Sequence, residues 1–247
     1  FKGPEIKFSL RAAIIDQLGF GNTQNPEFNK TVGTLLIDAG FDVFYHKSET
    51  IRVNFFAELT NYNYGLIILR VHSALREDNS TVDLFTSEEY TNSSAASYRA
   101  TYGTGLLVRG VYSWEPNKSY FAITSKFVDK VMSQFPRSII IAMGCWSLRH
   151  GCEQMAAAFI NKGAEAYIGW NDTVYQGATD NEIINLLSKL LNDNEKLGDA
   201  ISETDGYPMP GGITHLDFYP KSAYNLTISE LIKEAKPSKT LQSTVDI

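Results

Sequence analysis

Two short apolar stretches, far apart in the sequence, each end in a side chain that can take part in chemistry. Residues 138–145 are SIIIAMGC, in which three isoleucines are followed by small residues and Cys145. Residues 64–72 are YGLIILRVH, a mostly apolar run that ends in His72. An apolar run of this length is typical of a parallel strand covered on both faces. Because open parallel sheets bind their ligands outside the carboxyl ends of the strands, we expect His72 and Cys145 to meet in one crevice.

Strands and helices alternate along the chain. Strands are predicted at residues 9–16, 41–46 and 64–71, with helices between them at 25–40 and 53–60. This order indicates parallel pairing with crossover helices. Further helices are predicted at 124–135, 153–161, 179–191 (from a capping box at Thr179), 195–202 and 228–235, with strands at 138–142 and 165–170. The sequence therefore predicts an α/β fold, a three-layer α/β/α sandwich around a mostly parallel sheet.

Two segments depart from this alternation. Residues 76–122 are polar with short alternating runs, which predicts a β-rich insertion, a hairpin or loop region, over the carboxyl edge of the sheet. Residues 205–220 are rich in proline and glycine and are predicted to form a loop within a C-terminal appendage at about 205–247. The core then spans about 9–192, and the length of 247 residues fits a single domain.

The charge of the chain argues against several partners. A net charge of −6 and a pI near 5.3 disfavour nucleic acid or an anionic membrane as the main partner. No apolar run reaches the roughly 18 residues that a membrane span needs. No signal peptide is visible, although a targeting segment outside this sequence is compatible with its start at Phe1.

Six Asn-x-Ser/Thr sequons favour an extracellular or cell-surface location, with a cytoplasmic location as the alternative. The sequons begin at Asn29, Asn79, Asn92, Asn117, Asn171 and Asn225.

The chain has two cysteines and four histidines. Cys145 follows a predicted buried strand, and the N-terminus of a following helix would lower the pKa of its thiol. The alternative is a buried structural cysteine. Cys152 is expected inside that helix, about two turns from Cys145 and too far for a disulfide. Among the histidines, His72 lies where a general base is needed. The others are expected to be structural or at the surface: His46, His150 and His215.

Sequence motifs for cofactors are missing. The cysteines and histidines lack the spacing of a zinc site, and there is no HExxH, GxGxxG or Walker A sequence. There is no G-x-S-x-G, which disfavours a serine hydrolase of the α/β-hydrolase kind. We therefore expect neither a metal site nor a cofactor.

Three motifs together resemble those of the caspase-like cysteine peptidases, a clan that includes gingipain, clostripain, legumain, separase and metacaspase. They are the apolar blocks before His72 and before Cys145, in that order, and the stretch AAFINKGAEAYIGW at residues 157–170. The last is similar to the Gly-Ala-x-x-Tyr-Ile-Gly strand that follows the cysteine helix in this family. The resemblance covers roughly residues 9–192 and is strongest to the gingipain and clostripain types. It implies a cysteine endopeptidase acting on peptides or proteins without a cofactor, although some relatives use calcium.

The resemblance also implies roles for individual residues. Cys145 would attack the scissile carbonyl, and His72 would protonate the leaving amine as a looser partner than an ordinary general base. The backbone N–H groups of Ser73 and Cys145 would form the oxyanion hole. The family usually has His-Gly where this chain has His72 and Ser73, a change that keeps backbone donation but alters the loop.

The resemblance maps the pocket for the residue before the cleaved bond onto Asp16 and onto the segment from Trp170 to Asp172. A carboxylate at the base of this pocket would favour Arg or Lys through charge-assisted pairing. The alternative is that Asp16 and Asp172 only cap loops or helices. Relatives that cut after basic residues often have Asp two positions before the cysteine, where this chain has Met143.

Two other functions fit the same scaffold. The first is a catalytically silent relative that uses the crevice for binding or as a scaffold, which the absence of His-Gly favours. The second is a flavodoxin-like domain that binds a small molecule.

Overall fold

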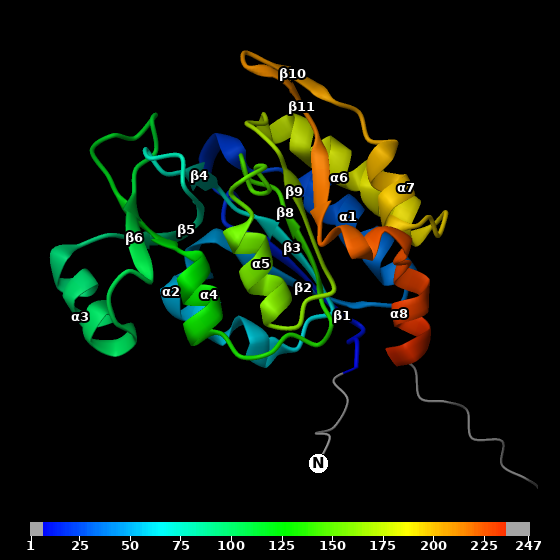
Figure 1. Cartoon of the computed structure of the whole chain (residues 1–247), viewed down its shortest axis with the longest axis horizontal. Coiled ribbons are helices and arrows are strands. Elements are labelled where there is room, and N and C mark those ends of the chain that lie inside the picture. Colours follow the sequence, from blue (N-terminus) through cyan, green and yellow to red (C-terminus); the bar gives the residue numbers. More distant parts are fainter. Residues whose placement is uncertain (1–6, 236–247) are drawn as a thin grey trace, which may run out of the picture.

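The computed structural model describes residues 7–235 and has a six-stranded sheet at its centre. The strands of this sheet are β1 (Arg11–Asp16), β2 (Asp42–Lys47), β3 (Leu66–Arg70), β8 (Ile139–Ala142), β9 (Ala166–Trp170) and β12 (Leu216–Tyr219). Their order is β12-β9-β8-β3-β1-β2, and all neighbours pair in parallel except β12, which runs antiparallel to β9 (Figure 1). The predicted mostly parallel sheet is confirmed.

The two apolar blocks of the sequence form neighbouring central strands. Every residue of β3 and of β8 is buried, because helices cover both faces of the sheet. Leu69 of β3 pairs with Ala142 of β8. His72 lies three residues after Leu69, and Cys145 lies three residues after Ala142. The fold therefore brings the carboxyl ends of the two strands side by side, as the sequence predicts.

Helices pack on both faces of the sheet. Figure 1 shows α2 (Val53–Glu58), α4 (Ser125–Val131) and α5 (Gln154–Asn161) on one side. On the other side lie α1 (Pro26–Asp38), α6 (Gln176–Leu191), α7 (Leu197–Ser202) and α8 (Ile228–Ala235). Each layer encloses its own hydrophobic core, because alternate strand residues such as Ile14 and Ile15 point to opposite faces. Short 3-10 helices span Gly21–Thr23, Ser48–Thr50, Leu59–Tyr62 and Lys221–Asn225.

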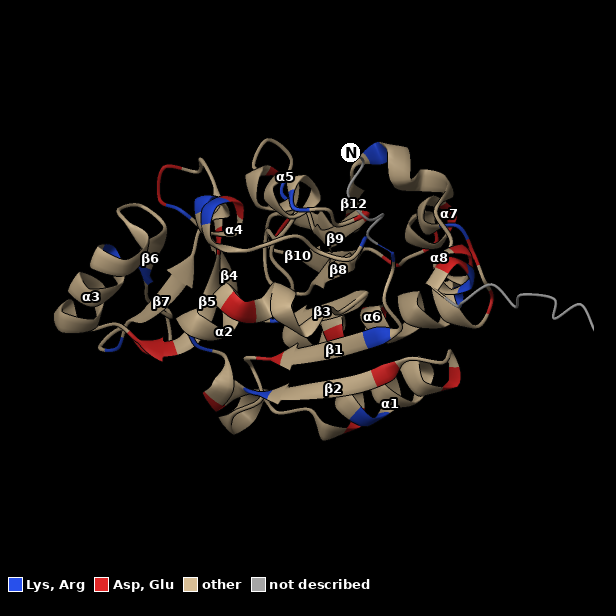
Figure 2. Cartoon of the chain, turned by 90° about the horizontal axis from the view of Figure 1, so that it is seen from below, with Lys and Arg blue, Asp and Glu red and all other residues tan. Residues whose placement is uncertain are grey.

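A second, antiparallel sheet follows β3. It contains β4 (Ser73–Leu75), β5 (Val82–Glu89), β7 (Tyr120–Ile123) and β6 (Leu107–Gly110), in the order β4-β5-β7-β6. Figure 2 shows this sheet on the side of the molecule towards which β1 and β2 point. The region is β-rich, as predicted, but it also contains helix α3 (Asn92–Tyr102). The sequence does not reveal α3 because its inward face is small: Ala95, Tyr98 and Tyr102 pack against the core only partly buried, and none of the helix's side chains is fully buried.

Two predictions about the later part of the chain are wrong. Residues 205–220 are not a loop: they form the hairpin of β10 (Tyr207–Met209) and β11 (Gly212–Thr214), followed by β12. Helix α6 begins at Gln176, three residues before the capping box predicted at Thr179. The Thr179 hydroxyl does not cap the helix: it donates to the Met143 carbonyl and accepts from the Trp170 indole N–H. None of the helices in the described part of the chain is both long and apolar enough to cross a membrane.

Candidate functional site

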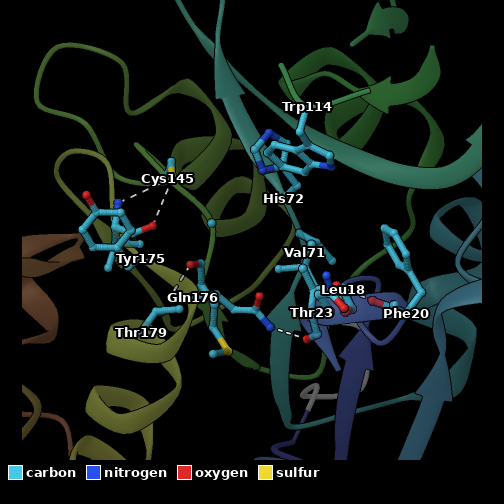
Figure 3. Close-up of a pocket in the computed structure, with 15 residues that line it drawn as sticks. Leu18, Phe20, Thr23, Val71, His72, Trp114, Cys145, Tyr175, Gln176 and Thr179 are labelled. Carbon is cyan, nitrogen blue, oxygen red and sulfur yellow. Dashed lines mark hydrogen bonds between the residues drawn. The ribbon is translucent and has the colours of Figure 1, made fainter. Parts of the chain in front are cut away.

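A cavity of about 570 Å³ opens beyond the carboxyl ends of β1, β3, β8 and β9 (Figure 3). Both His72 and Cys145 line it, at the ends of adjacent strands. The crevice predicted from the sequence is therefore present. Its lining comes from the segments after these four strands and from the second-sheet region: residues 18, 20–23, 71–72, 143–145 and 174–176, with Thr179 and Trp114.

Cys145 lies in a turn after β8, and its sulfur contacts the loop after β9. The Val174 N–H donates to Sγ at 3.5 Å, and the thiol donates to the Val174 carbonyl at 3.6 Å. Burial raises the pKa of the Cys145 thiol. The prediction of a thiol pKa lowered by a helix N-terminus is wrong, because turns separate Cys145 from α5, which begins only at Gln154. At neutral pH Cys145 is a thiol rather than a thiolate.

The imidazole of His72 is packed against three aromatic rings. Its centroid lies 4.7 Å from that of Phe85, 5.0 Å from that of Tyr112 and 5.5 Å from that of Trp114, with all three contacts edge-to-face. Burial among these rings lowers the pKa of His72 to about 4, so the imidazole is neutral at pH 7. Within residues 7–235, no hydrogen bond joins this imidazole to the Cys145 thiol.

The loops that carry the two residues touch each other through Gly144 and Ser73. A Cβ on Gly144 would lie 2.2 Å from Ser73 Oγ, 2.6 Å from the Val71 carbonyl oxygen and 2.7 Å from the Ser73 nitrogen, so only glycine fits there. The Ser73 hydroxyl donates to the Cys145 carbonyl at 2.6 Å. The backbone nitrogen of Ser73 therefore lies beside the turn that carries Cys145.

Gln17 and Tyr112 also stabilise the segment that carries His72, and the sequence does not predict either of them as a site residue. Gln17 is buried; its Oε1 accepts from the His72 N–H at 2.9 Å, and its Nε2 donates to the Tyr112 hydroxyl at 2.7 Å. The ring of Tyr112 stacks on Trp114, with centroids 4.7 Å apart. The sequence gives little sign of these contacts, because they form only when the second-sheet region folds against the main sheet. Its one signal is Trp114, which stands in the mostly polar stretch 113–119.

Asp16 lies outside the cavity lining, in a buried ion-pair cluster. Its Oδ1 accepts from Arg70 Nη1 at 2.6 Å, and Arg70 Nε donates to Asp180 Oδ1 at 2.8 Å. The other oxygen of Asp16 accepts from Asn29 Nδ2 at 3.0 Å and from the Tyr45 hydroxyl at 2.9 Å. This pairing ties the ends of β1 and β3 to α6, and the role of Asp16 at the base of a specificity pocket stays a prediction.

Trp170 and Asp172 are also outside the cavity lining. Trp170 is fully buried, and its indole N–H donates to Thr179 Oγ1 at 2.7 Å. The Asp172 carboxylate accepts from the Thr173 N–H at 2.6 Å, and its carbonyl accepts from the Trp146 N–H at 3.0 Å. Asp172 therefore closes its own loop, which is the structural alternative that the sequence left open.

The second cysteine and the other histidines do not reach the cavity. Cys152 precedes α5 instead of lying within it, and its buried thiol donates to the Asn79 carbonyl at 3.3 Å. Both cysteines are free. His46 bonds the Tyr64 hydroxyl at 2.8 Å, whereas His150 and His215 are exposed. In the described part of the chain, no three His, Cys, Asp or Glu side chains are placed to hold a metal ion.

Comparison of the sequence with models of protein families, and with curated proteins, found no match.

Proposed function

We propose that this chain is a cysteine endopeptidase with a caspase-like fold, in which Cys145 is the nucleophile and His72 its proton-transfer partner. The supporting observation is that these two residues, far apart in the sequence, end adjacent parallel strands and line the same cavity. On this proposal the second sheet is an insertion beside the carboxyl edge of a caspase-like core. The chemistry needs no cofactor, and calcium remains an implication of the resemblance alone.

Proton transfer in this site starts from an uncharged pair. As Sγ of Cys145 attacks the scissile carbonyl carbon, the S–H proton passes to His72 and the carbonyl π electrons move to oxygen. The intermediate collapses, the C–N bond breaks, and the imidazolium gives its proton to the leaving amine. An imidazole with a pKa of about 4 releases that proton readily. Water then hydrolyses the thioester with His72 as its base, and the thiol is restored.

The negative oxygen of the intermediate needs hydrogen-bond donors. The backbone N–H groups of Ser73 and Cys145 are the proposed donors, because Gly144 lets the two segments approach closely. One such donor contributes about 3 kcal/mol of transition-state stabilisation. The serine in place of the family's glycine holds the Cys145 carbonyl, so it stabilises the turn that presents the nucleophile.

A preference for Arg or Lys before the cleaved bond lacks a carboxylate to support it. Asp16 is paired with Arg70, Asp172 closes its own loop, and neither lines the cavity.

A silent binding or scaffold domain is the second candidate function. Two features favour it: burial shifts the pKa of each group towards its neutral form, and no hydrogen bond joins the thiol to the imidazole in the described part of the chain. Such a domain would bind peptides in the same cavity without cutting them.

Digestion of a proteome-derived peptide library, with new N-termini found by mass spectrometry, separates the two functions. We expect cleavage by the native chain, loss of at least a hundredfold in Cys145→Ala and His72→Ala, and full activity in Cys152→Ser. The last variant is the matched control, because serine can keep the hydrogen bond to Asn79. Cleavage that persists in Cys145→Ala, or no cleavage by the native chain, would reject the peptidase.

A cell-surface or extracellular location stays a prediction. Four of the sequon asparagines are exposed and accessible to a glycan: Asn79, Asn92, Asn117 and Asn225.

A further inference from the structure

Three large apolar side chains that the protein leaves exposed surround the cavity. Phe20, Trp114 and Tyr175 are 40%, 61% and 64% exposed, and all three line it. They come from three separate segments of the chain, and Figure 3 shows them on three sides of the cavity. Exposed aromatic side chains gathered at a cavity are typical of a site that binds an apolar group.

Between the aromatic residues the lining is aliphatic. Leu18, Val71, Met143 and Val174 contribute to it, and Val71 and Met143 are buried. Met143 lies two positions before Cys145, so the lining residue at that position is also apolar.

The polar side chains of the lining are largely engaged with the protein itself. Thr23 Oγ1 donates to the Leu18 carbonyl at 2.6 Å, and Thr179 Oγ1 to the Met143 carbonyl at 3.3 Å. The amide of Gln176 donates to the carbonyl of Thr23. These three groups hold the loops in place, which leaves the exposed Asn22 as the lining amide that no such bond engages within residues 7–235.

No charged side chain lines the cavity among residues 7–235. The buried carboxylates nearest in sequence to its walls, Asp16 and Asp180, are both paired with Arg70. The half-buried Asp172, whose charge adds to the rise in the pKa of Cys145, does not line the cavity and accepts from the Thr173 N–H. A guanidinium or ammonium group entering the cavity would therefore lose its hydration without gaining a carboxylate partner in the lining.

We infer that this cavity takes a bulky apolar side chain of the substrate, such as Phe, Tyr, Leu or Met, next to the scissile bond, and disfavours Arg and Lys. The inference rests on the proposed peptidase function. The volume of about 570 Å³ accommodates any of these side chains.

A panel of fluorogenic peptide amides that differ only in the residue before the amide tests this inference. We expect kcat/KM for Phe, Tyr, Leu and Met to exceed that for Arg and Lys by tenfold or more. An equal or higher kcat/KM for Arg or Lys would overturn the inference and leave the peptidase intact. Absence of turnover with every amide and with the peptide library would instead reject the peptidase, and the inference with it.

A pair of surface variants tests the aromatic rim separately. Tyr175→Ala should raise KM for the Phe substrate about fivefold and leave kcat nearly unchanged, because Tyr175 lines the cavity without touching His72. Ile213→Ala is the matched control, since Ile213 is 61% exposed and does not line the cavity. An unchanged KM in Tyr175→Ala would contradict the inference.

Discussion

Burial determines the charge of both side chains in the proposed dyad. The rings of Phe85, Tyr112 and Trp114 remove water from His72, and the loop at Val174 covers the Cys145 sulfur. Each group is therefore uncharged at rest, and a charge develops only during the reaction.

The lowered pKa of His72 makes stability depend on pH. The unfolded chain protonates this imidazole below its ordinary pKa of 6.5, whereas the native protein resists protonation until about pH 4. The free energy of unfolding should therefore fall by about 2 kcal/mol from pH 7 to pH 4.5 because of His72 alone. Urea unfolding of the native chain and of His72→Leu measures this. The native chain should show the steeper fall, with exposed His150→Gln behaving like the native chain; equal slopes for the native chain and His72→Leu would contradict the account.

Among the secondary-structure elements, β1, β3 and α6 meet through one buried ion cluster below the cavity. Arg70 at the end of β3 pairs with Asp16 of β1 and Asp180 of α6, and its Nη2 donates to the Thr23 carbonyl at 2.9 Å. The cluster thereby connects the framework of the sheet to a loop that lines the cavity.

Replacing Arg70 should destabilise the protein strongly. Arg70→Met leaves two buried carboxylates without their partner, and we expect the free energy of unfolding to fall by about 3–5 kcal/mol. Exposed Arg109→Met is the control and should change it by less than about 0.5 kcal/mol. Denaturant midpoints of the two variants give the comparison, and a loss below about 1 kcal/mol in Arg70→Met would show that the cluster is not needed.

The elements that the sequence predicts are those with a clear apolar pattern. The isoleucine run of β8 indicates a buried strand, and Asn25, whose side chain accepts from the Phe28 N–H, caps α1 where the Asn-Pro pair suggests. Helix α3 has only a weak pattern, because the side chains that it packs on the core, Ala95, Tyr98 and Tyr102, are only partly buried. The strand β12 is hidden by the proline- and glycine-rich stretch before it, since its pairing with β9 depends on the fold.

At the scale of the whole molecule, the two sheets together build the site. The main sheet supplies the strand ends that bear His72 and Cys145, and the second-sheet region adds Trp114 to the cavity wall. The sequence predicts the meeting of the first two residues because parallel strand ends share an edge. It does not predict that Arg70 joins Asp16 to Asp180, because Asp180 comes from α6, 110 residues further along the chain than Arg70.

Covalent labelling tests most directly whether the cavity performs thiol chemistry. The intact chain is incubated with a peptidyl-Phe acyloxymethyl ketone, which loses its carboxylate as the cysteine sulfur forms a thioether. Mass spectrometry of the intact chain and of its peptides then counts and locates the adducts. We expect one adduct per chain, located on Cys145, absent in Cys145→Ala, retained in Cys152→Ser and formed at least a hundredfold more slowly in His72→Ala. No adduct on the native chain, or an adduct that remains in Cys145→Ala, would contradict it.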